Sequence, residues 1–194
     1  MAQMTAQDLP LRTCVGIMLI NRAGLIWIGQ RQPKWVKAPI WQMPQGGLLP
    51  KEEPQAGALR ELREETSVRH VEIVAEAPGW LTYELPPELI GVALKGRYRG
   101  QRQRWFAMRF TGPDSEIDIR ARGGRKSEFD AWRWAYASEA LSLAIPYKRP
   151  LYEQVVNQFQ EHIAPDKPRT GSGRPRSWSD FFWRRQRGVR AAGA

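Results

Sequence analysis

The amino-acid sequence predicts an α/β fold in which helices cover both faces of a central mixed β-sheet. Short apolar runs typical of strands are interleaved with few helical patterns, which favours a mixed sheet over a bundle of helices. The 194 residues, 42% of them apolar, suffice for one domain with a sizeable core. We therefore expect a single domain over residues 1–164, followed by a separate C-terminal segment, 165–194.

The first half of the chain predicts a hairpin, a loop and a helix. The apolar runs at 14–20 and 25–31 flank residues 21–24, where Asn21 and Gly24 supply turn chemistry, so they are predicted as paired strands. Residues 38–54 are dense in Pro and Gly and are predicted as an irregular loop. A helix follows, with Pro54 in its first turn, where the missing N–H would have no partner.

The second half predicts strands, a long excursion and a second helix. Residues 71–76, 105–110, 116–119 and 128–136 have strand patterns, and 120–127 is predicted as a basic turn. Residues 79–105 mix prolines with four arginines and are predicted as a functional loop. In 147–163, apolar residues at 151, 155, 156 and 159 recur at helical spacing. We expect Pro165 to end that helix.

Charge and composition limit the partners and the compartment. The chain carries a net charge of +10, and the segment 165–194 holds eight Lys or Arg against two Asp, which suits a polyanion such as nucleic acid. Neither a secretory signal nor an apolar run of about 18 residues is present, so we expect a soluble, cytoplasmic protein without a membrane partner. Cys14, the only cysteine, lies in an apolar run and is expected to pack in the core rather than act as a nucleophile.

The first helix carries an acidic cluster that has two explanations. Glu61, Glu64 and Glu65 fall on a narrow arc, where like charges cost about 0.2–0.5 kcal/mol per pair. Arg60 and Arg63 flank them, so the arc could be a salt-bridged surface. Alternatively, the carboxylates collect a hard dication such as Mg²⁺, which prefers oxygen ligands.

The spacing around this cluster favours the metal site. Gly46, Glu52 and Arg60 precede the series Glu61, Leu62, Glu64, Glu65, Ser67 and Val68 at fixed intervals. Segment 46–68 thereby resembles the Nudix box, G-x5-E-x7-R-E-U-x-E-E-x-G-U with U aliphatic, at eight of its nine defined positions. Ser67 is the departure, because the family has Gly there, and a left-handed Ser would cost about 1–2 kcal/mol.

The resemblance implies a Nudix α/β/α sandwich with a central mixed β-sheet and hydrolysis of a nucleoside diphosphate linked to another moiety. Divalent metal cations, Mg²⁺ with Mn²⁺ or Zn²⁺ as alternatives, would bind Glu61, Glu64, Glu65 and the carbonyl of Gly46 and activate a water. Arg60 would orient a catalytic glutamate, and Glu52 would support the loop. Sequence alone does not decide which glutamate is the general base.

Four further segments, within a match that spans roughly Arg12 to Phe159, resemble the branch of the family that acts on RNA 5′ ends and on dinucleoside polyphosphates. They are 41–47 (WQMPQGG), 100–106 (GQRQRWF), 128–134 (EFDAWRW) and 146–152 (PYKRPLY). The resemblance makes Glu128 a metal ligand or general base, where an edge residue is the structural alternative. It assigns phosphate and nucleotide contacts to Arg31 and Lys148, which could instead be merely solvated, and base stacking to Tyr147 beside Ile145, where burial of the Tyr competes.

Three functions remain open at this stage. The favoured one removes pyrophosphate from 5′-triphosphorylated or diphosphorylated RNA, leaves a 5′-monophosphate and promotes RNA degradation. The second acts on diadenosine or other nucleotide polyphosphates, and the third is a catalytically silent RNA-binding module. Arginines in the excursion could form a basic rim for RNA: Arg97, Arg99, Arg102 and Arg104. The tail 165–194 is expected to be disordered, and RNA tethering, docking of a protein partner and no role are all open.

Overall fold

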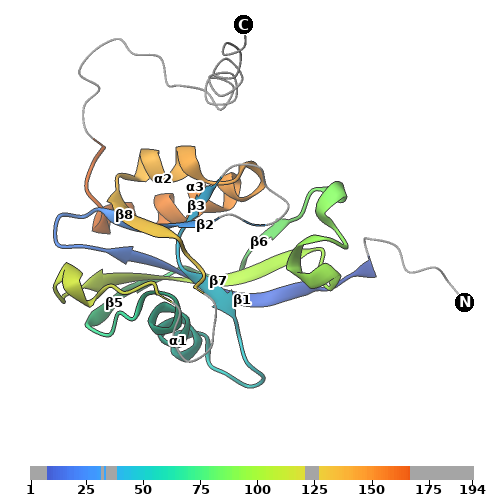
Figure 1. The fold of residues 1–194 in the computed structure, drawn as a ribbon, viewed down its shortest axis with the longest axis horizontal. Helices are drawn as coiled ribbons and strands as arrows, with labels where there is room; N and C mark the ends of the chain where they lie inside the picture. The colour runs from blue at the N-terminus through green and yellow to red at the C-terminus, as the bar shows by residue number, and fades with distance from the viewer. Residues whose placement is uncertain (1–7, 32, 34–38, 121–126, 167–194) are drawn as a thin grey trace, which may run out of the picture.

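The computed structural model describes residues 8–31, 33, 39–120 and 127–166, which form a mixed β-sheet with helices on both faces (Figure 1). The main strand order is β3 (Ile40–Gln42), β2 (Ile26–Arg31), β1 (Leu11–Ile20), β7 (Gly100–Phe110) and β5 (Val71–Glu76). Three further strands pair with these: β4 (Gln45–Gly47) with β1, β6 (Leu81–Glu84) with β7, and β8 (Ala131–Ala135) with β2. Because β1 and β7 are parallel and the other pairs antiparallel, the predicted mixed sheet is confirmed.

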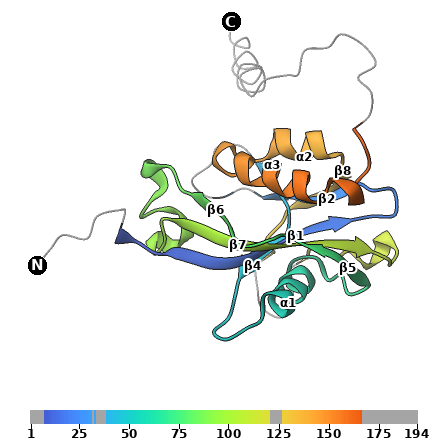
Figure 2. The same cartoon turned by 180° about the vertical axis from the view of Figure 1, so that it is seen from behind.

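The helices divide between the two faces of this sheet. Helix α1 (Pro54–Thr66) lies on one face, and α2 (Ala137–Leu143) and α3 (Arg149–Gln158) lie together on the other, as the reverse view shows (Figure 2). α1 buries Ala58 and Leu62 against one half of the core, and α3 buries Leu151 and Val155 in the other. The predicted placement of helices on both faces is therefore confirmed.

β1 is apolar along most of its length because it is covered on both faces. Its residues alternate between the two halves of the core, with Ile17 and Leu19 on the α1 side and Met18 and Ile20 on the α2–α3 side. All four side chains are fully buried. This rigid central strand carries β4, and with it the start of the acidic segment, on one of its edges.

The prediction of an irregular loop over 38–54 is wrong in part, because the segment contains β3 and β4. Both strands have three residues, and their pairing comes from neighbours rather than from a periodic pattern. Gly46 and Gly47 of β4 pair with Val15 and Cys14 of β1. Pro and Gly density therefore concealed two short strands that are fixed by tertiary contacts.

The predicted excursion over 79–105 also contains regular structure. β6 occupies residues 81–84, and β7 begins at Gly100, five residues before the predicted start of its strand. The early part of β7 is polar in sequence, yet Gln101 and Gln103 are buried there. What remains irregular is the stretch between these strands, which holds only short 3₁₀ turns.

The remaining differences concern short elements. The strand predicted at 116–119 is wrong: a 3₁₀ turn (Asp114–Glu116) stands there, and Asp118 donates its N–H to the Thr66 carbonyl at the end of α1. The strand predicted at 128–136 is shorter, and α2 was not predicted. The last helix is confirmed at its centre, with 3₁₀ turns at Pro146–Lys148 and Gln160–His162 replacing its predicted ends.

Several predictions lie outside the described residues. They include most of the basic turn, residues 121–126, and the tail beyond residue 166. The domain boundary between residues 164 and 165 thus stays a prediction. Within the described part of the chain, no helix combines the length and the apolar character needed to cross a membrane.

Candidate active site

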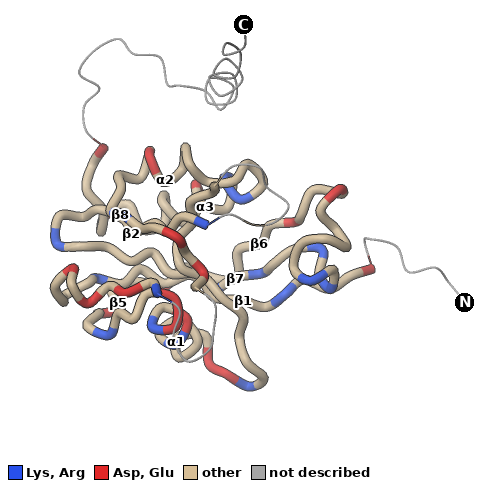
Figure 3. The backbone as a smooth tube through the Cα atoms, in the orientation of Figure 1, with Lys and Arg blue, Asp and Glu red and all other residues tan. Residues whose placement is uncertain are grey.

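Helix α1 presents an acidic face because its apolar residues point the other way. Ala58 and Leu62 are buried against the sheet, and Pro54 occupies the first turn as predicted. Glu61 and Glu65 are half-buried beside β4, while Glu64 is exposed. Figure 3 shows acidic and basic stretches close together on this helix. Two of the sequence-predicted carboxylates, Glu61 and Glu65, thus lie next to β4.

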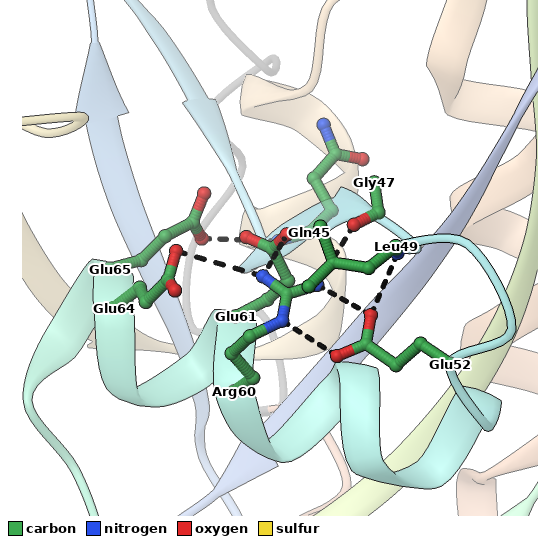
Figure 4. A network of polar contacts seen from close by, with 8 residues as sticks. All are labelled: Gln45, Gly47, Leu49, Glu52, Arg60, Glu61, Glu64 and Glu65. Atoms are coloured by element: carbon green, nitrogen blue, oxygen red, sulfur yellow. Dashed lines mark hydrogen bonds and ion pairs between the residues drawn. The ribbon is translucent and has the colours of Figure 1, made fainter.

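Arg60 is the residue that joins the acidic segment into one network (Figure 4). Its guanidinium donates to both oxygens of Glu52 over 2.7 and 2.8 Å and to the Gly47 carbonyl over 2.9 Å. It also donates to Glu61 Oε1 over 2.8 Å and lies 3.6 Å from Glu64 Oε2. This geometry fits an orienting role for Arg60, and it includes the surface salt bridge that the sequence offered as the alternative.

Glu52 supports the loop between β4 and α1. Besides holding Arg60, its Oε2 accepts the Leu49 N–H over 2.9 Å. The hydrogen bonds from Arg60 and then from the Leu49 N–H lower the pKa of Glu52 to about 2. Its carboxylate therefore stays ionised at neutral pH and fixes the loop.

The backbone of β4 approaches two carboxylates very closely. A Cβ on Gly46 would lie 1.9 Å from Cδ of Glu61, so any other residue there would displace that carboxylate. The Gln45 N–H donates to Glu65 Oε2 over 3.1 Å. Burial, followed by repulsion from Glu128 and Glu61, raises the pKa of Glu65 well above its usual value. Glu128 is thus close enough to the helix carboxylates to add to their negative charge.

Ser67, the departure from the family pattern, ends α1 in a left-handed conformation with φ of 65°. Its N–H donates to the Arg63 carbonyl over 2.9 Å, as glycine would at a helix end. Its hydroxyl donates to the Asp118 carbonyl over 2.9 Å. That bond offsets part of the cost of placing a side chain in this conformation.

A cavity of about 460 Å³ opens beside the carboxylates. Its lining contains five cationic side chains against one acidic one, Glu128. Gln45 lines the cavity and its N–H contacts Glu65, so the cavity meets the acidic site at this residue. The cationic residues of the lining are Arg12, Arg31, Lys95, Arg97 and Lys148.

The predicted substrate residues Arg31, Tyr147 and Lys148 line this cavity, whereas Ile145 does not. Arg31 forms an ion pair with Glu128, which also lines the cavity. Lys148 is 94% buried, since its exposed fraction is 6%. Burial, and then the charge of Arg31, lower the pKa of Lys148 to about 8. Ile145 is buried, and its carbonyl accepts the Lys148 N–H.

The sequence did not predict several residues of the cavity, among them Lys95, Tyr83 and Arg12. Tyr83 lies on β6, with its ring 5.7 Å from the Tyr147 ring and 5.3 Å from Lys148 Nζ. Arg12 lies near the start of β1, directly opposite Gln101 of β7. The only available signal was the alternation of β6, which turns Leu81 and Tyr83 to the same side.

The four arginines proposed as one basic rim are divided by the structure. Arg97 lines the cavity, but Arg99 contacts Glu84 and the Leu9 carbonyl. Arg102 and Arg104 stack over Trp80, at 5.0 and 5.9 Å from its ring centroid, and Arg104 pairs with Glu76. The four therefore do not form a continuous surface around the cavity.

Three residues outside the cavity serve packing, as was expected for Cys14. Cys14 is fully buried, and desolvation raises its thiol pKa to about 11, which keeps it neutral. Trp132 stacks on Trp27 at 6.3 Å. Gln103 accepts the Trp105 indole N–H and donates to Gln45, linking β7 to β4. These residues support the site without lining it.

The donor set suits a hard divalent cation in its chemistry, although it is not arranged as a finished ligand sphere. In the described ranges, no three acidic, His or Cys side chains converge as a metal-binding group. Arg60 contacts Glu61 and Glu64, and Arg31 contacts Glu128. However, all candidate donors are oxygens, and burial followed by repulsion from Glu128 and Glu61 raises the pKa of Glu65, a repulsion that a bound cation would relieve. We conclude that the residues fit such an ion.

Comparison with known proteins agrees with the box and the fold. The family model described as NUDIX domain matches residues 10–158. A protein of Rhodopseudomonas palustris (strain HaA2) named RNA pyrophosphohydrolase is 56% identical over 158 residues, covering 80% of this chain and 95% of the relative. A protein of Rhizobium meliloti (strain 1021) with the same name is 52% identical over 166 residues, covering 82% and 99%.

Solved structures support the fold alone, because their sequence identity is low. A C. elegans Ap4A hydrolase in a binary complex has a TM-score of 0.55 at 15% identity and covers 78% of this chain and 99% of its own. A MutT protein from Methanosarcina mazei Go1 has a TM-score of 0.55 at 18% identity, covering 77% and 96%. Both resemble the whole layered arrangement around the sheet.

Proposed function

The chain belongs to the NUDIX family of hydrolases, and we propose that it is an RNA pyrophosphohydrolase, which removes pyrophosphate from the 5′ end of triphosphorylated RNA. One observation carries the proposal: the acidic face of α1 meets a cationic cavity at Gln45. Phosphates need the cations for binding and the carboxylates for chemistry, and here the two lie side by side.

The cavity supplies contacts for the reacting end of the RNA. Arg12, Arg31 and Lys148 offer charged donors for terminal phosphate oxygens. Tyr147 lies half-buried on its wall, packed against Tyr83, and presents aromatic surface for a base. Stacking on such rings contributes about 1–3 kcal/mol per base and tolerates any base. This combination suits a 5′ end of variable sequence.

The acidic residues would hold the metal ions with which Nudix hydrolases generally act. We assign Glu61, Glu64, Glu65, Glu128 and the Gly46 carbonyl as ligands. Bound Mg²⁺, or Mn²⁺ or Zn²⁺ in its place, would neutralise phosphate charge and make a bound water more acidic. Each carboxylate has two oxygens, so Glu61 can keep its bond to Arg60 and still present an oxygen to the site.

In the reaction, water adds to phosphorus of the 5′ polyphosphate and the bridging P–O bond breaks. Pyrophosphate leaves, and a 5′-monophosphorylated RNA remains. Arg60 positions Glu61 through its bonds to Glu52 and Gly47, and Arg31 positions Glu128. The water's proton passes to one of the site carboxylates. The cationic side chains of the cavity hold the 5′-monophosphate of the product until it is released.

The experiment compares two substrates. The purified protein and Mg²⁺ are incubated with 5′-triphosphorylated RNA and with diadenosine tetraphosphate, and kcat/KM is measured for each. Efficient cleavage of the RNA is expected. Cleavage of the dinucleotide alone would replace the proposal by the second candidate, and turnover of neither would favour a silent RNA-binding module.

A pair of glutamine variants tests the carboxylate assignment. Glu64→Gln removes one proposed ligand from an exposed position of α1, and we expect turnover to fall by at least about a hundredfold. Glu72→Gln neutralises an exposed glutamate of β5 and serves as the control. Near-wild-type turnover by Glu64→Gln would show that the ligand set is wrong.

A further inference from the structure

A strained turn stands beside the cavity, in the irregular stretch between β6 and β7. Leu94 (φ 52°, ψ 36°) and Lys95 (φ 59°, ψ 23°) are both left-handed, and Gly96 follows with φ of 68°. Elsewhere in the described residues, left-handed non-glycine residues occur singly. Each such residue costs about 1–2 kcal/mol, so two in succession require the surroundings to hold them.

The surroundings of this turn hold it at both ends. Leu94 packs against the buried core on the α2–α3 side, and its carbonyl accepts the Arg97 N–H over 3.3 Å. A Cβ on Gly96 would lie 2.6 Å from the Gly91 carbonyl oxygen, so the chain closes tightly there. The turn therefore has a fixed shape, and its cost is retained in the folded protein.

What the turn accomplishes is to place two cations at the cavity. Lys95 and Arg97 both line it, and both side chains are exposed, which puts them at its open side. Among the described residues, no hydrogen bond or ion pair engages either side chain. By contrast, Arg31 in the same cavity is paired with Glu128.

The phosphates at the reacting 5′ end do not need the two cationic side chains of Lys95 and Arg97. Arg12, Arg31 and Lys148 already serve the terminal phosphates, and they are buried or half-buried. Lys95 and Arg97 are solvated and stand apart from the carboxylates of α1, which do not line the cavity. Phosphate contacts of this exposed kind position a nucleic acid without reading its bases.

We propose that Lys95 and Arg97, presented by the left-handed turn 94–96, form a subsite for backbone phosphates of single-stranded RNA downstream of the reacting 5′ end. This inference rests on the proposed function and adds a preference for chain length. A substrate of two nucleotides fills the inner cavity but leaves the subsite empty. A longer RNA fills both and binds more tightly.

The test measures kcat/KM for 5′-triphosphorylated RNAs of two and about eight nucleotides, the latter within the usual site sizes for single strands. The wild-type protein should prefer the longer RNA by about tenfold, which corresponds to two modest phosphate contacts. Lys95→Gln/Arg97→Gln should lose most of that preference. The variant should also reduce the slope of log kcat/KM against log salt concentration by roughly 1.4, since each contact contributes about 0.7.

The control is Lys51→Gln/Arg69→Gln, which removes the same charge outside the cavity. Lys51 matches Lys95 closely, because it is an exposed lysine with φ of 63°. Equal cleavage of both RNAs by the wild type, or an unchanged preference in Lys95→Gln/Arg97→Gln, would overturn the subsite. An equal loss of the length preference in the control variant would show that the preference comes from the overall charge of the protein and not from this subsite. Failure of the wild type to cleave either RNA would instead refute the proposed function.

Discussion

Ser67 shows how one residue can replace the glycine at the end of α1. Its φ of 65° is a cost, and its hydroxyl bond to the Asp118 carbonyl is a gain. We predict that Ser67→Ala lowers the free energy of unfolding by about 1 kcal/mol, because the strain stays and the bond is lost. Ser67→Gly should change it by less than about 1 kcal/mol, because strain and bond disappear together. Urea unfolding of the three proteins measures both values.

The decisive result is which of the two variants has the lower free energy of unfolding. If Ser67→Ala were as stable as the wild type, the bond to Asp118 would contribute nothing. The sequence predicted the strained conformation from the family pattern, but not the compensating bond. That bond joins positions 51 residues apart, and no local pattern encodes such a contact.

Glu52 predicts a pH dependence of stability. Its pKa is lowered to about 2 in the folded protein, so its ionised form contributes stability that is complete above the unfolded pKa near 4.5. That contribution is lost as the pH falls from about 5 towards 2. We therefore expect Glu52→Gln to be less stable than the wild type at pH 7, with a gap that narrows on acidification. A gap of constant size between pH 7 and pH 3 would contradict the assignment.

At the scale of elements, the contact between β4 and α1 depends on Gly46. A Cβ there would meet the carboxylate of Glu61, the end of a flexible side chain that can move away. We predict that Gly46→Ala folds with a loss of less than about 1 kcal/mol but reduces kcat/KM more than about tenfold. Gly112→Ala is the control, because its Cβ would meet the Glu116 carboxylate at 2.2 Å, away from the site. Full activity of Gly46→Ala would show that the position of the Glu61 carboxylate does not matter for catalysis.

Helix α3 is linked to the segment between β3 and β4 by a single buried hydrogen bond. The Met43 N–H donates to the Tyr152 hydroxyl over 3.1 Å, and both residues are buried. Tyr152→Phe would leave that N–H without a partner, so we predict a loss of about 1–3 kcal/mol in the free energy of unfolding. Chemical denaturation measures it. An unchanged midpoint would mean that the bond adds nothing to stability.

The elements that the sequence predicted are those whose own pattern determines them. α1 has a box of fixed spacing, and the two strands flanking Asn21 are long apolar runs. β3, β4 and α2 are short, and their neighbours decide their conformation. The predicted strand at 116–119 failed because the Asp118 N–H binds the end of α1 instead of another strand.

At the scale of the whole molecule, the sequence predicted the acidic residues and the residues of the cavity separately. It did not predict how the fold joins them into one site. The box predicted the carboxylates, and the segments containing Arg31, Glu128 and Lys148 predicted the residues that face them. The parallel pairing of β1 with β7, which sets Arg12 opposite Gln101 in the cavity wall, has no signal in the sequence. Separation of the excursion's arginines likewise follows from the start of β7 at Gly100, because Arg97 and Arg99 precede that strand whereas Arg102 and Arg104 lie on it.

Net charge is also a property of the whole molecule, and it predicts how salt affects turnover. The segment 165–194, most of it outside the described residues, carries eight Lys or Arg of the 30 in the chain. If it attracts RNA by charge alone, replacing Arg184, Arg185, Arg187 and Arg190 by Gln in the full chain should raise KM several-fold at low salt and leave kcat unchanged. Near 0.5 M salt, screening over a few ångströms should abolish the difference. Steady-state kinetics across a salt series tests this, and a KM effect that persisted at high salt would indicate a specific contact instead.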